Sequence, residues 1–156
     1  MQKNNLKSWI VPLVIPLAVG GIAALLTRGN MDVYQTVTQP PFAPPAVVFP
    51  IVWTVLYLLM GVSAKLIGDT ASGDKAAALA VYYLQLIVNF FWPILFFNKQ
   101  AFFVSFWWLV LLWILVLVMV VRFYRIRPIA GLLQLPYLLW VTFAGVLNFS
   151  IWWLNR

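Results

Sequence analysis

Five long apolar stretches, separated by polar segments, run along this chain. They cover residues 9–26, 46–67, 76–97, 101–121 and 129–154. Each is close to or above the roughly 20 residues that a helix needs to cross the hydrocarbon core of a bilayer. Their residues are apolar on all sides instead of alternating with period two, which predicts helices and not a membrane β-barrel. We therefore expect an all-α integral membrane protein, a five-transmembrane-helix bundle forming a single domain over residues 1–156.

The segments between the stretches differ in length. Those at residues 68–75, 98–100 and 122–128 are short, so consecutive helices should be antiparallel neighbours. The first loop, residues 27–45, is long, and a long loop in a compact bundle is often a lid or a binding loop. Its four closely spaced prolines predict a stiff, extended strap across one end of the bundle. A rigid turn that only positions the second helix is the alternative.

The composition supports the membrane assignment. The chain is 65% hydrophobic and only 8% charged, which excludes a soluble protein and a disordered one. The formal charge of +7 comes from basic residues scattered between apolar stretches, so we expect the lipid bilayer and no nucleic acid as a partner.

The basic residues also predict an orientation. Seven flank one side of the spans and three flank the other: Lys3, Lys7, Lys65, Lys75, Arg122, Arg125 and Arg127 against Arg28, Lys99 and Arg156. By the positive-inside rule, the N-terminus is cytoplasmic, while the C-terminus and the first loop lie outside.

Missing residue types exclude most catalytic chemistry. The chain has no His and no Cys, and its acids are Asp32, Asp69 and Asp74, all outside the apolar stretches. A zinc site, a disulfide, a Ser/His/Asp triad, a thiol nucleophile and haem ligation by His or Cys are all excluded. We expect no metal site and no cofactor. An ion or drug pump is disfavoured because no ionisable residue lies in mid-span.

Aromatic and amide side chains share helix faces at i, i+3 and i+4 spacing. The three faces, on the second, third and fifth spans, are Trp53, Tyr57 and Met60; Gln85, Asn89, Trp92 and Phe96; and Trp140, Phe143, Ala144, Leu147 and Asn148. The amides should point inward because an amide facing lipid would lack hydrogen-bond partners. These faces predict a charge-free cavity with flat aromatic walls, suited to a flat, largely apolar ligand. The alternative is that the amides only tie helices together.

The other tryptophans have a different expected role. Trp9, Trp107, Trp108, Trp152 and Trp153 lie mostly near span ends, where Trp is enriched at the membrane–water interface. We expect them to face lipid. Small residues at Gly20 and Ala24, and at Ala76 and Ala80, mark close helix packing, either within one chain or at a dimer seam.

Four ordered motifs resemble those of the translocator protein family, TspO/MBR, also called tryptophan-rich sensory protein or peripheral benzodiazepine receptor. The motifs are Pro40-Pro41-Phe42-Ala43-Pro44-Pro45; Phe49-Pro50-Ile51-Val52-Trp53 through Tyr57 to Met60-Gly61; Gln85, Asn89, Trp92-Pro93 and Phe96-Phe97; and Pro136-Tyr137, Trp140, Phe143-Ala144 and Leu147-Asn148. The resemblance covers the whole chain and implies five membrane helices with a long first loop.

The resemblance also implies a function. It indicates a bacterial cell-membrane protein, a homodimer, that binds porphyrins and related tetrapyrroles for transport or sensing. Carried over by motif, the ligand-binding residues are Tyr34, Trp53, Tyr57, Asn89, Trp92, Trp140, Phe143, Ala144 and Leu147. Some family members are reported to degrade protoporphyrin IX in light with pocket tryptophans involved, so Trp53 and Trp140 are the candidate catalytic residues if this protein is an enzyme. A regulatory membrane partner is a further alternative.

The sequence departs from the family pattern in three places. Val33-Tyr34 stands where the family usually has Trp-Tyr, and Gln39-Pro40-Pro41-Phe42 stands where it has Lys-Pro-Ser-Trp. Phe149 follows Asn148 where animal members have the Tyr of a sterol motif. Sterol binding is therefore not predicted here.

Overall fold

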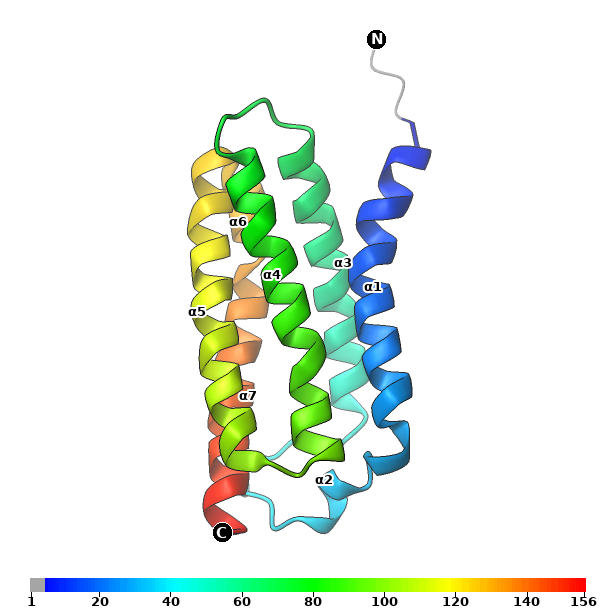
Figure 1. Ribbon diagram of the computed structural model, residues 1–156, viewed down its shortest axis with the longest axis vertical. Coiled ribbons are helices and arrows are strands. Elements are labelled where there is room, and N and C mark those ends of the chain that lie inside the picture. The colour runs from blue at the N-terminus through cyan, green and yellow to red at the C-terminus, as the bar shows by residue number, and fades with distance from the viewer. Residues whose placement is uncertain (1–4) are drawn as a thin grey trace.

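Five long helices, each antiparallel to the next in sequence, form an elongated bundle (Figure 1). The computed structural model describes residues 5–156. The long helices are α1 (Lys7–Thr27), α3 (Val48–Gly68), α4 (Lys75–Pro93), α5 (Phe102–Ile126) and α7 (Leu135–Leu154); the short elements are η1 (Arg28–Asn30), α2 (Val33–Thr36), η2 (Ile94–Asn98) and α6 (Pro128–Leu132). Within residues 5–156, five segments are long and apolar enough to cross a membrane, which confirms the predicted five-helix membrane bundle.

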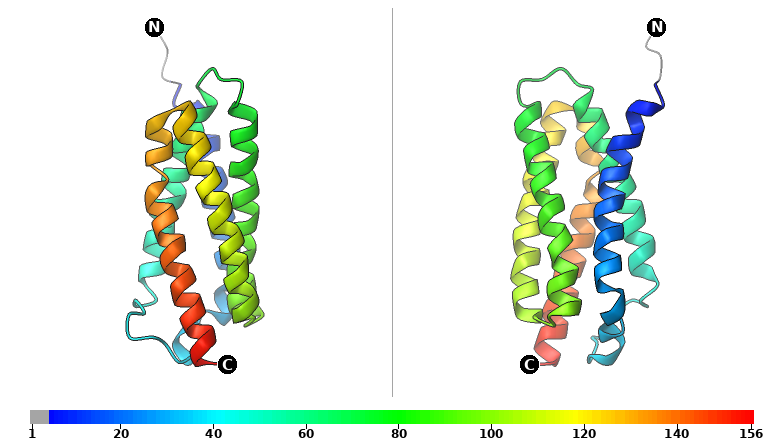
Figure 2. Two further views of the ribbon diagram at one scale, coloured as in Figure 1. Left: turned by 90° about the vertical axis from the view of Figure 1, so that its left-hand side faces the viewer. Right: turned by 45° about the vertical axis from the view of Figure 1, so that its right-hand side comes forward.

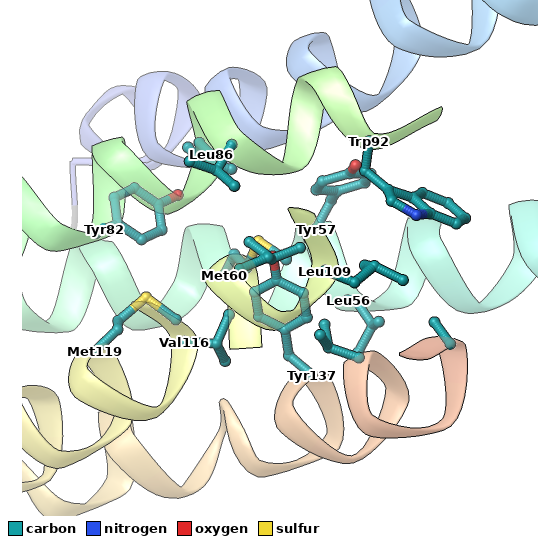
Figure 3. Packing of buried hydrophobic residues seen from close by; sticks show 14 of the residues in the cluster. Leu56, Tyr57, Met60, Tyr82, Leu86, Trp92, Leu109, Val116, Met119 and Tyr137 are labelled. Carbon is teal, nitrogen blue, oxygen red and sulfur yellow. The ribbon is translucent and has the colours of Figure 1, made fainter. Parts of the chain in front are cut away.

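The helices enclose a core to which α3, α4, α5 and α7 all contribute. α5 packs against α4 and α7, and α1 packs on the outside of α3 and α4 (Figure 2). Met60 of α3, Val116 of α5 and Tyr137 of α7 meet in this core and are almost completely buried (Figure 3). The outer surface is apolar as well, with Leu139 70% and Ile51 61% exposed. Large apolar side chains exposed all around a bundle fit a lipid environment.

α1 and α3 approach closely through two glycines. A Cβ on Gly61 would lie 2.6 Å from the carbonyl oxygen of Pro12, and one on Gly20 would lie 2.2 Å from the Tyr57 ring. Gly20 therefore serves packing within the chain. Ala76 and Ala80 instead lie on an exposed face of α4.

The first loop differs from the predicted extended strap. Its first part is helical, in η1 and α2, and only the proline-rich part that follows is irregular. A tight turn interrupts that part, because the Ala43 N–H donates to the Pro40 carbonyl at 3.0 Å. Prolines fix φ but leave ψ free, so a proline-rich segment can turn as readily as extend. The loop crosses the end of the bundle where α7 ends, here called the loop end (Figure 1).

Two helix boundaries also differ from the prediction. α5 continues to Ile126, five residues past the predicted end at 121, because Arg122 and Arg125 are exposed and can extend to the interface without leaving the helix. The predicted fifth span, 129–154, is divided into α6 and α7, with Pro136 in the first turn of α7, where its missing N–H costs little.

Pro93 changes the geometry of the third span. It ends α4 as an α-helix, and the chain continues as a π-helical turn over η2. Pro93 cannot donate to the carbonyl of Asn89, so the regular hydrogen-bond ladder is interrupted there. The wider turn carries Phe96 into the core, where it is 3% exposed.

Candidate ligand-binding site

A hydrogen-bonded cluster joins three helices in the middle of the bundle. Tyr57 Oη donates to Asn89 Oδ1 at 3.2 Å, and Asn89 Nδ2 donates to Tyr137 Oη at 2.7 Å. Tyr137 Oη in turn donates to Gln85 Oε1 at 2.7 Å. The Trp53 ring stacks on Tyr57 with 5.5 Å between centroids and meets Tyr137 edge-on at 6.0 Å. Gln85 and Asn89 therefore point inward as predicted, and both side chains hold tyrosines in place.

A second polar set lies closer to the loop end. Asn148 Oδ1 accepts from Trp92 Nε1 at 3.0 Å and from Ser105 Oγ at 2.9 Å, and its Nδ2 donates to the carbonyl of Phe102 at 2.8 Å. One amide thereby joins α7 to α4 and α5. The hydrogen bond from Trp92 fixes the orientation of that indole ring.

An aromatic row borders the site below the first loop. Tyr34 of α2 meets Phe49 at 5.1 Å, Phe49 meets Trp140 at 5.8 Å, and Trp140 meets Phe143 at 5.3 Å between centroids. Phe42, in the proline-rich turn, lies 6.3 Å from Phe143 and is 49% exposed. Residues from α2, α3, α7 and the first loop thus form one continuous wall.

Hydrogen bonds secure the first loop over this wall. Tyr34 Oη donates to the carbonyl of Pro44 at 2.7 Å, and Gln39 Nε2 donates to the carbonyl of Tyr34. Asn155, just past α7, holds both backbone groups of Thr38: its Oδ1 accepts from the Thr38 N–H and its Nδ2 donates to the Thr38 carbonyl, each at 2.9 Å. Burial raises the pKa of the Tyr34 hydroxyl above its usual 10.0. The loop is therefore tied both to itself and to the end of α7.

The aromatic wall and the second polar set enclose a small cavity. Its lining residues are Tyr34, Phe49, Trp92, Phe96, Phe97, Ala144, Leu147, Asn148 and Ile151. None of them carries a charge. The cavity measures about 10 Å³, room for about one water molecule. At this size the cavity is nearly closed, and the predicted site for a flat ligand stays a prediction.

Trp140 has a polar atom without a partner. Its Nε1 is buried and donates no hydrogen bond to any described residue. A buried donor of this kind costs about 1–3 kcal/mol when unsatisfied. A ligand that brings an acceptor to this atom recovers part of that cost.

The structure brings the predicted residues together in three groups. Tyr34, Trp92, Ala144 and Leu147 line the cavity; Trp140 and Phe143 belong to the aromatic row; and Trp53, Tyr57 and Asn89 form the cluster deeper in the bundle. Their contact with a ligand stays a prediction. Phe49, Tyr137 and Ile151 are not among the residues that the sequence predicted to bind the ligand. Ile151 continues the Ala144, Leu147 and Asn148 helical face, and that spacing was the signal available for it.

The remaining tryptophans lie away from the cavity. Trp107 is 56% and Trp153 49% exposed, as expected for lipid-facing residues. Trp108 is different, since its Nε1 donates to the Val88 carbonyl at 2.7 Å and ties α5 to α4. Trp9 lies 5.5 Å from the Lys65 ammonium, at the opposite end of the bundle.

The chemistry available to this site is limited. It offers aromatic faces, amides and hydroxyls, and no carboxylate or ammonium lies among the residues that line the cavity. No cluster of His, Cys, Asp or Glu that could hold a metal occurs within residues 5–156. The arrangement can stack, hydrogen-bond and exclude water.

Comparison with known proteins gives a consistent result. The model of the TspO/MBR family matches residues 12–154. The chain is 35% identical to protein CrtK of Rhodobacter capsulatus, covering 97% of this chain and 94% of that one. It is 37% identical to tryptophan-rich protein TspO of Chlorobaculum tepidum (89% and 90% covered) and 30% identical to the translocator protein of Bos taurus (92% and 87% covered). The chain therefore belongs to the TspO/MBR family of integral membrane proteins.

Proposed function

We propose that this protein binds a flat, largely apolar ligand of the porphyrin or tetrapyrrole class between the first loop and α3, α4 and α7, for transport or sensing. The observation that carries the proposal is the buried, unpartnered N–H of Trp140, whose ring meets that of Phe49, a residue that lines the charge-free aromatic cavity, at 5.8 Å between centroids. Aromatic stacking contributes about 0.5–1.5 kcal/mol per pair beyond the burial of area. A ring system with a carboxylate or carbonyl acceptor matches both the aromatic faces and the free donor.

Binding such a ligand requires the first loop to move. A cavity of about 10 Å³ is far below the roughly 300–1,000 Å³ of ligand pockets. Tyr34 and Phe49 line this space with their rings in contact, and the Tyr34 hydroxyl is hydrogen-bonded to the loop at the Pro44 carbonyl. Displacing these rings therefore moves the proline-rich segment, which links occupancy of the site to the shape of the outer surface. That link supports transport or sensing.

The test is a titration with protoporphyrin IX, followed through its own visible absorption in detergent. Trp140→Phe removes the free donor and should weaken binding about tenfold, the effect of roughly 1.4 kcal/mol for a lost hydrogen bond and part of a ring contact. Trp107→Phe, the same change on the lipid-facing surface, is the matched control and should bind as the wild type does. Equal affinity of both variants would contradict the assignment of the site.

Light-driven oxidative degradation of protoporphyrin IX is the second candidate function. It is favoured by the stack of Trp53 on Tyr57, two readily oxidised rings that adjoin the site. The porphyrin would supply the chromophore and dioxygen the oxidant, so no acid, base or metal of the protein is needed. Illuminated protein should convert bound porphyrin to a new product that does not form in darkness. Bleaching at the same rate in detergent alone removes this candidate.

We also propose an orientation in the bacterial cell membrane, with the N-terminus cytoplasmic and the loop end outside. The uneven distribution of basic residues supports it. The chain has no cysteine, and Gly29 and Gly73 lie at opposite ends with open space around them. In intact cells a membrane-impermeant maleimide should label Gly29→Cys and spare Gly73→Cys. Labelling of Gly73→Cys alone would reverse the orientation.

A homodimer is proposed on the resemblance, with support from α4. Ala76 and Ala80 have small-residue spacing on an exposed face and make no close packing within the chain. Replacing both by leucine should shift purified protein from dimer to monomer in analytical ultracentrifugation, because bulky side chains keep helices apart. A dimer that survives this change does not use that face.

A further inference from the structure

An apolar groove of about 450 Å³ runs along the outer surface between α5 and α7. It is separate from the small cavity beneath the first loop and shares no lining residue with it. Phe106 and Phe149, whose rings meet at 5.2 Å, border it near the loop end, and Trp113 borders it further along. The groove faces the hydrocarbon of the bilayer, since both helices span the membrane.

Gly145 opens the floor of the groove. A Cβ built on this residue would have no atom within 4 Å, so the space beside α7 is empty of protein at this point. Any larger side chain would extend into the groove. The depth of the groove therefore depends on the absence of a side chain at a single position.

The polar atoms of the groove are already paired. Trp113 Nε1 donates to Thr142 Oγ1 at 2.8 Å, and Thr142 Oγ1 donates to the carbonyl of Leu138 at 2.8 Å. The remaining lining is hydrocarbon and aromatic ring. A molecule that fits this groove therefore needs no hydrogen-bonding group where it lies against these residues. A flexible acyl chain meets that requirement.

A cation lies at the end of the same aromatic surface. The ring of Phe149 stacks with that of Trp153 at 6.3 Å, and the guanidinium carbon of Arg156 lies 3.3 Å from the Trp153 ring centroid. Arg156 forms no ion pair within residues 5–156. Arginine binds phosphate groups well, and its contact with an indole ring holds it in place at the depth of lipid headgroups.

From this continuity between groove and cation, we propose that the α5–α7 groove is a specific binding site for one phospholipid with an anionic headgroup. One acyl chain lies over Gly145 between Phe106 and Trp113, and the phosphate lies against Arg156. Each methylene that enters the groove adds contact with fixed side chains, while the phosphate compensates an unpaired charge. A second copy of this chain seated in the groove is the competing occupant.

The proposed site for the acyl chain is tested with phosphatidylglycerol that carries a photoreactive diazirine in the middle of one acyl chain, mixed into phosphatidylcholine nanodiscs. Mass spectrometry of the irradiated wild type should locate adducts on α5 and α7 at the groove. Gly145→Leu fills the groove and should reduce those adducts at least fivefold. Gly21→Leu is the matched control, since Gly21 also has open space, on the exposed surface of α1, and should leave them unchanged.

The headgroup site is tested by exchanging the lipid. Arg156→Gln should abolish the preference of the groove for photoreactive phosphatidylglycerol over photoreactive phosphatidylcholine, whereas Lys99→Gln, which removes a charge from the same end, should retain it. Circular dichroism spectra of the variants check that each is folded. Equal adduct yields for Gly145→Leu and Gly21→Leu overturn the proposal, as does loss of a dimer in Gly145→Leu. Neither result bears on protoporphyrin binding beneath the first loop.

Discussion

Single amide side chains join helices that apolar packing alone would leave free to slide. Asn148 satisfies Trp92, Ser105 and the Phe102 carbonyl at once, and Asn89 bridges Tyr57 and Tyr137. In a bilayer the hydrophobic effect does not drive helices together, so directional bonds have a larger part in setting their register. At the scale of the residue, this protein is organised by its few polar groups.

Replacing Asn148 tests that organisation. Asn148→Ala leaves the Trp92 N–H without its acceptor and removes the hydrogen bonds from α7 to Ser105 and the Phe102 carbonyl, and we expect a loss of about 1–2 kcal/mol in the free energy of unfolding. Unfolding by sodium dodecyl sulfate in mixed micelles, followed by circular dichroism, measures the change. Asn5→Ala, at an exposed position before α1, is the control and should have no effect. An unchanged unfolding midpoint for Asn148→Ala would show that packing alone holds these helices.

Tyr34 gives the closed first loop a dependence on alkaline pH. Burial raises its pKa above 10.0, so the neutral phenol is the form that the closed loop favours. As the pH rises past 10.0, the exposed tyrosine of an open loop ionises first. The free energy that favours the closed loop therefore falls, until the pH passes the raised pKa of Tyr34 in the closed loop. Hydrogen–deuterium exchange of residues 37–47, corrected for the intrinsic rate, should increase over this range. Tyr34→Phe should abolish that increase, and a persisting increase would assign it to another group.

At the scale of the helices, two glycines allow α1 and α3 to pack closely against each other. α1 touches α3 at Gly20 and Gly61, and Gly20 lies directly against the ring of Tyr57. The same ring is held on its hydroxyl by Asn89 and on its face by Trp53. The position of α1 is therefore coupled to the site, although none of its residues lines the cavity.

Gly20→Ala tests whether a change in α1 affects the site through Tyr57. The added methyl would lie 2.2 Å from Tyr57 Cε2, and the ring has little room to yield. We expect a destabilisation of about 1–3 kcal/mol, typical of overpacking, and weaker protoporphyrin binding. Gly21→Ala, with open space, should behave like the wild type in both thermal unfolding and titration. Identical melting curves for the two variants would contradict the tight contact.

At the scale of the whole molecule, the two ends of the bundle differ. The loop end carries the aromatic row, the proline-rich turn and the two hydrogen bonds between Asn155 and Thr38, here called the Asn155 clasp. The other end carries short connections and most of the basic residues. The hydrogen bonds of the clasp are exposed to water, where each contributes only about 0.5–1.5 kcal/mol. The first loop is therefore closed by interactions weak enough for a ligand to overcome.

Opening the clasp should make the loop more mobile without unfolding the bundle. Asn155→Ala removes both bonds to Thr38, and we expect faster hydrogen–deuterium exchange in residues 37–47 by about fivefold or more, the effect of roughly 1–2 kcal/mol. Exchange in α5 should stay unchanged and serves as the internal control. An equal rate in variant and wild type would show that Tyr34 and Phe42 suffice to hold the loop.

The number of helices and the inward direction of Gln85, Asn89 and Asn148 follow from the order of residues. An apolar stretch of about 20 residues can satisfy its backbone in lipid only as a helix, and an amide in lipid is stable only when it faces a partner. The residues at which the helices end do not follow from the sequence in the same way. Arginine side chains can stay helical at the interface, so the charges at Arg122 and Arg125 did not mark the end of α5.

What the sequence by itself determined is the class of the molecule: a helical membrane bundle with an aromatic face on each of three spans. Only the tertiary structure decided that Phe49 and Tyr34 meet at the cavity, that Asn155 closes the first loop, and that Gly145 opens a groove toward lipid. The physical reason is the separation along the sequence of the residues that interact. Periodicity and composition act within one helix, whereas these contacts join residues as far apart as Thr38 and Asn155, and depend on how the helices pack.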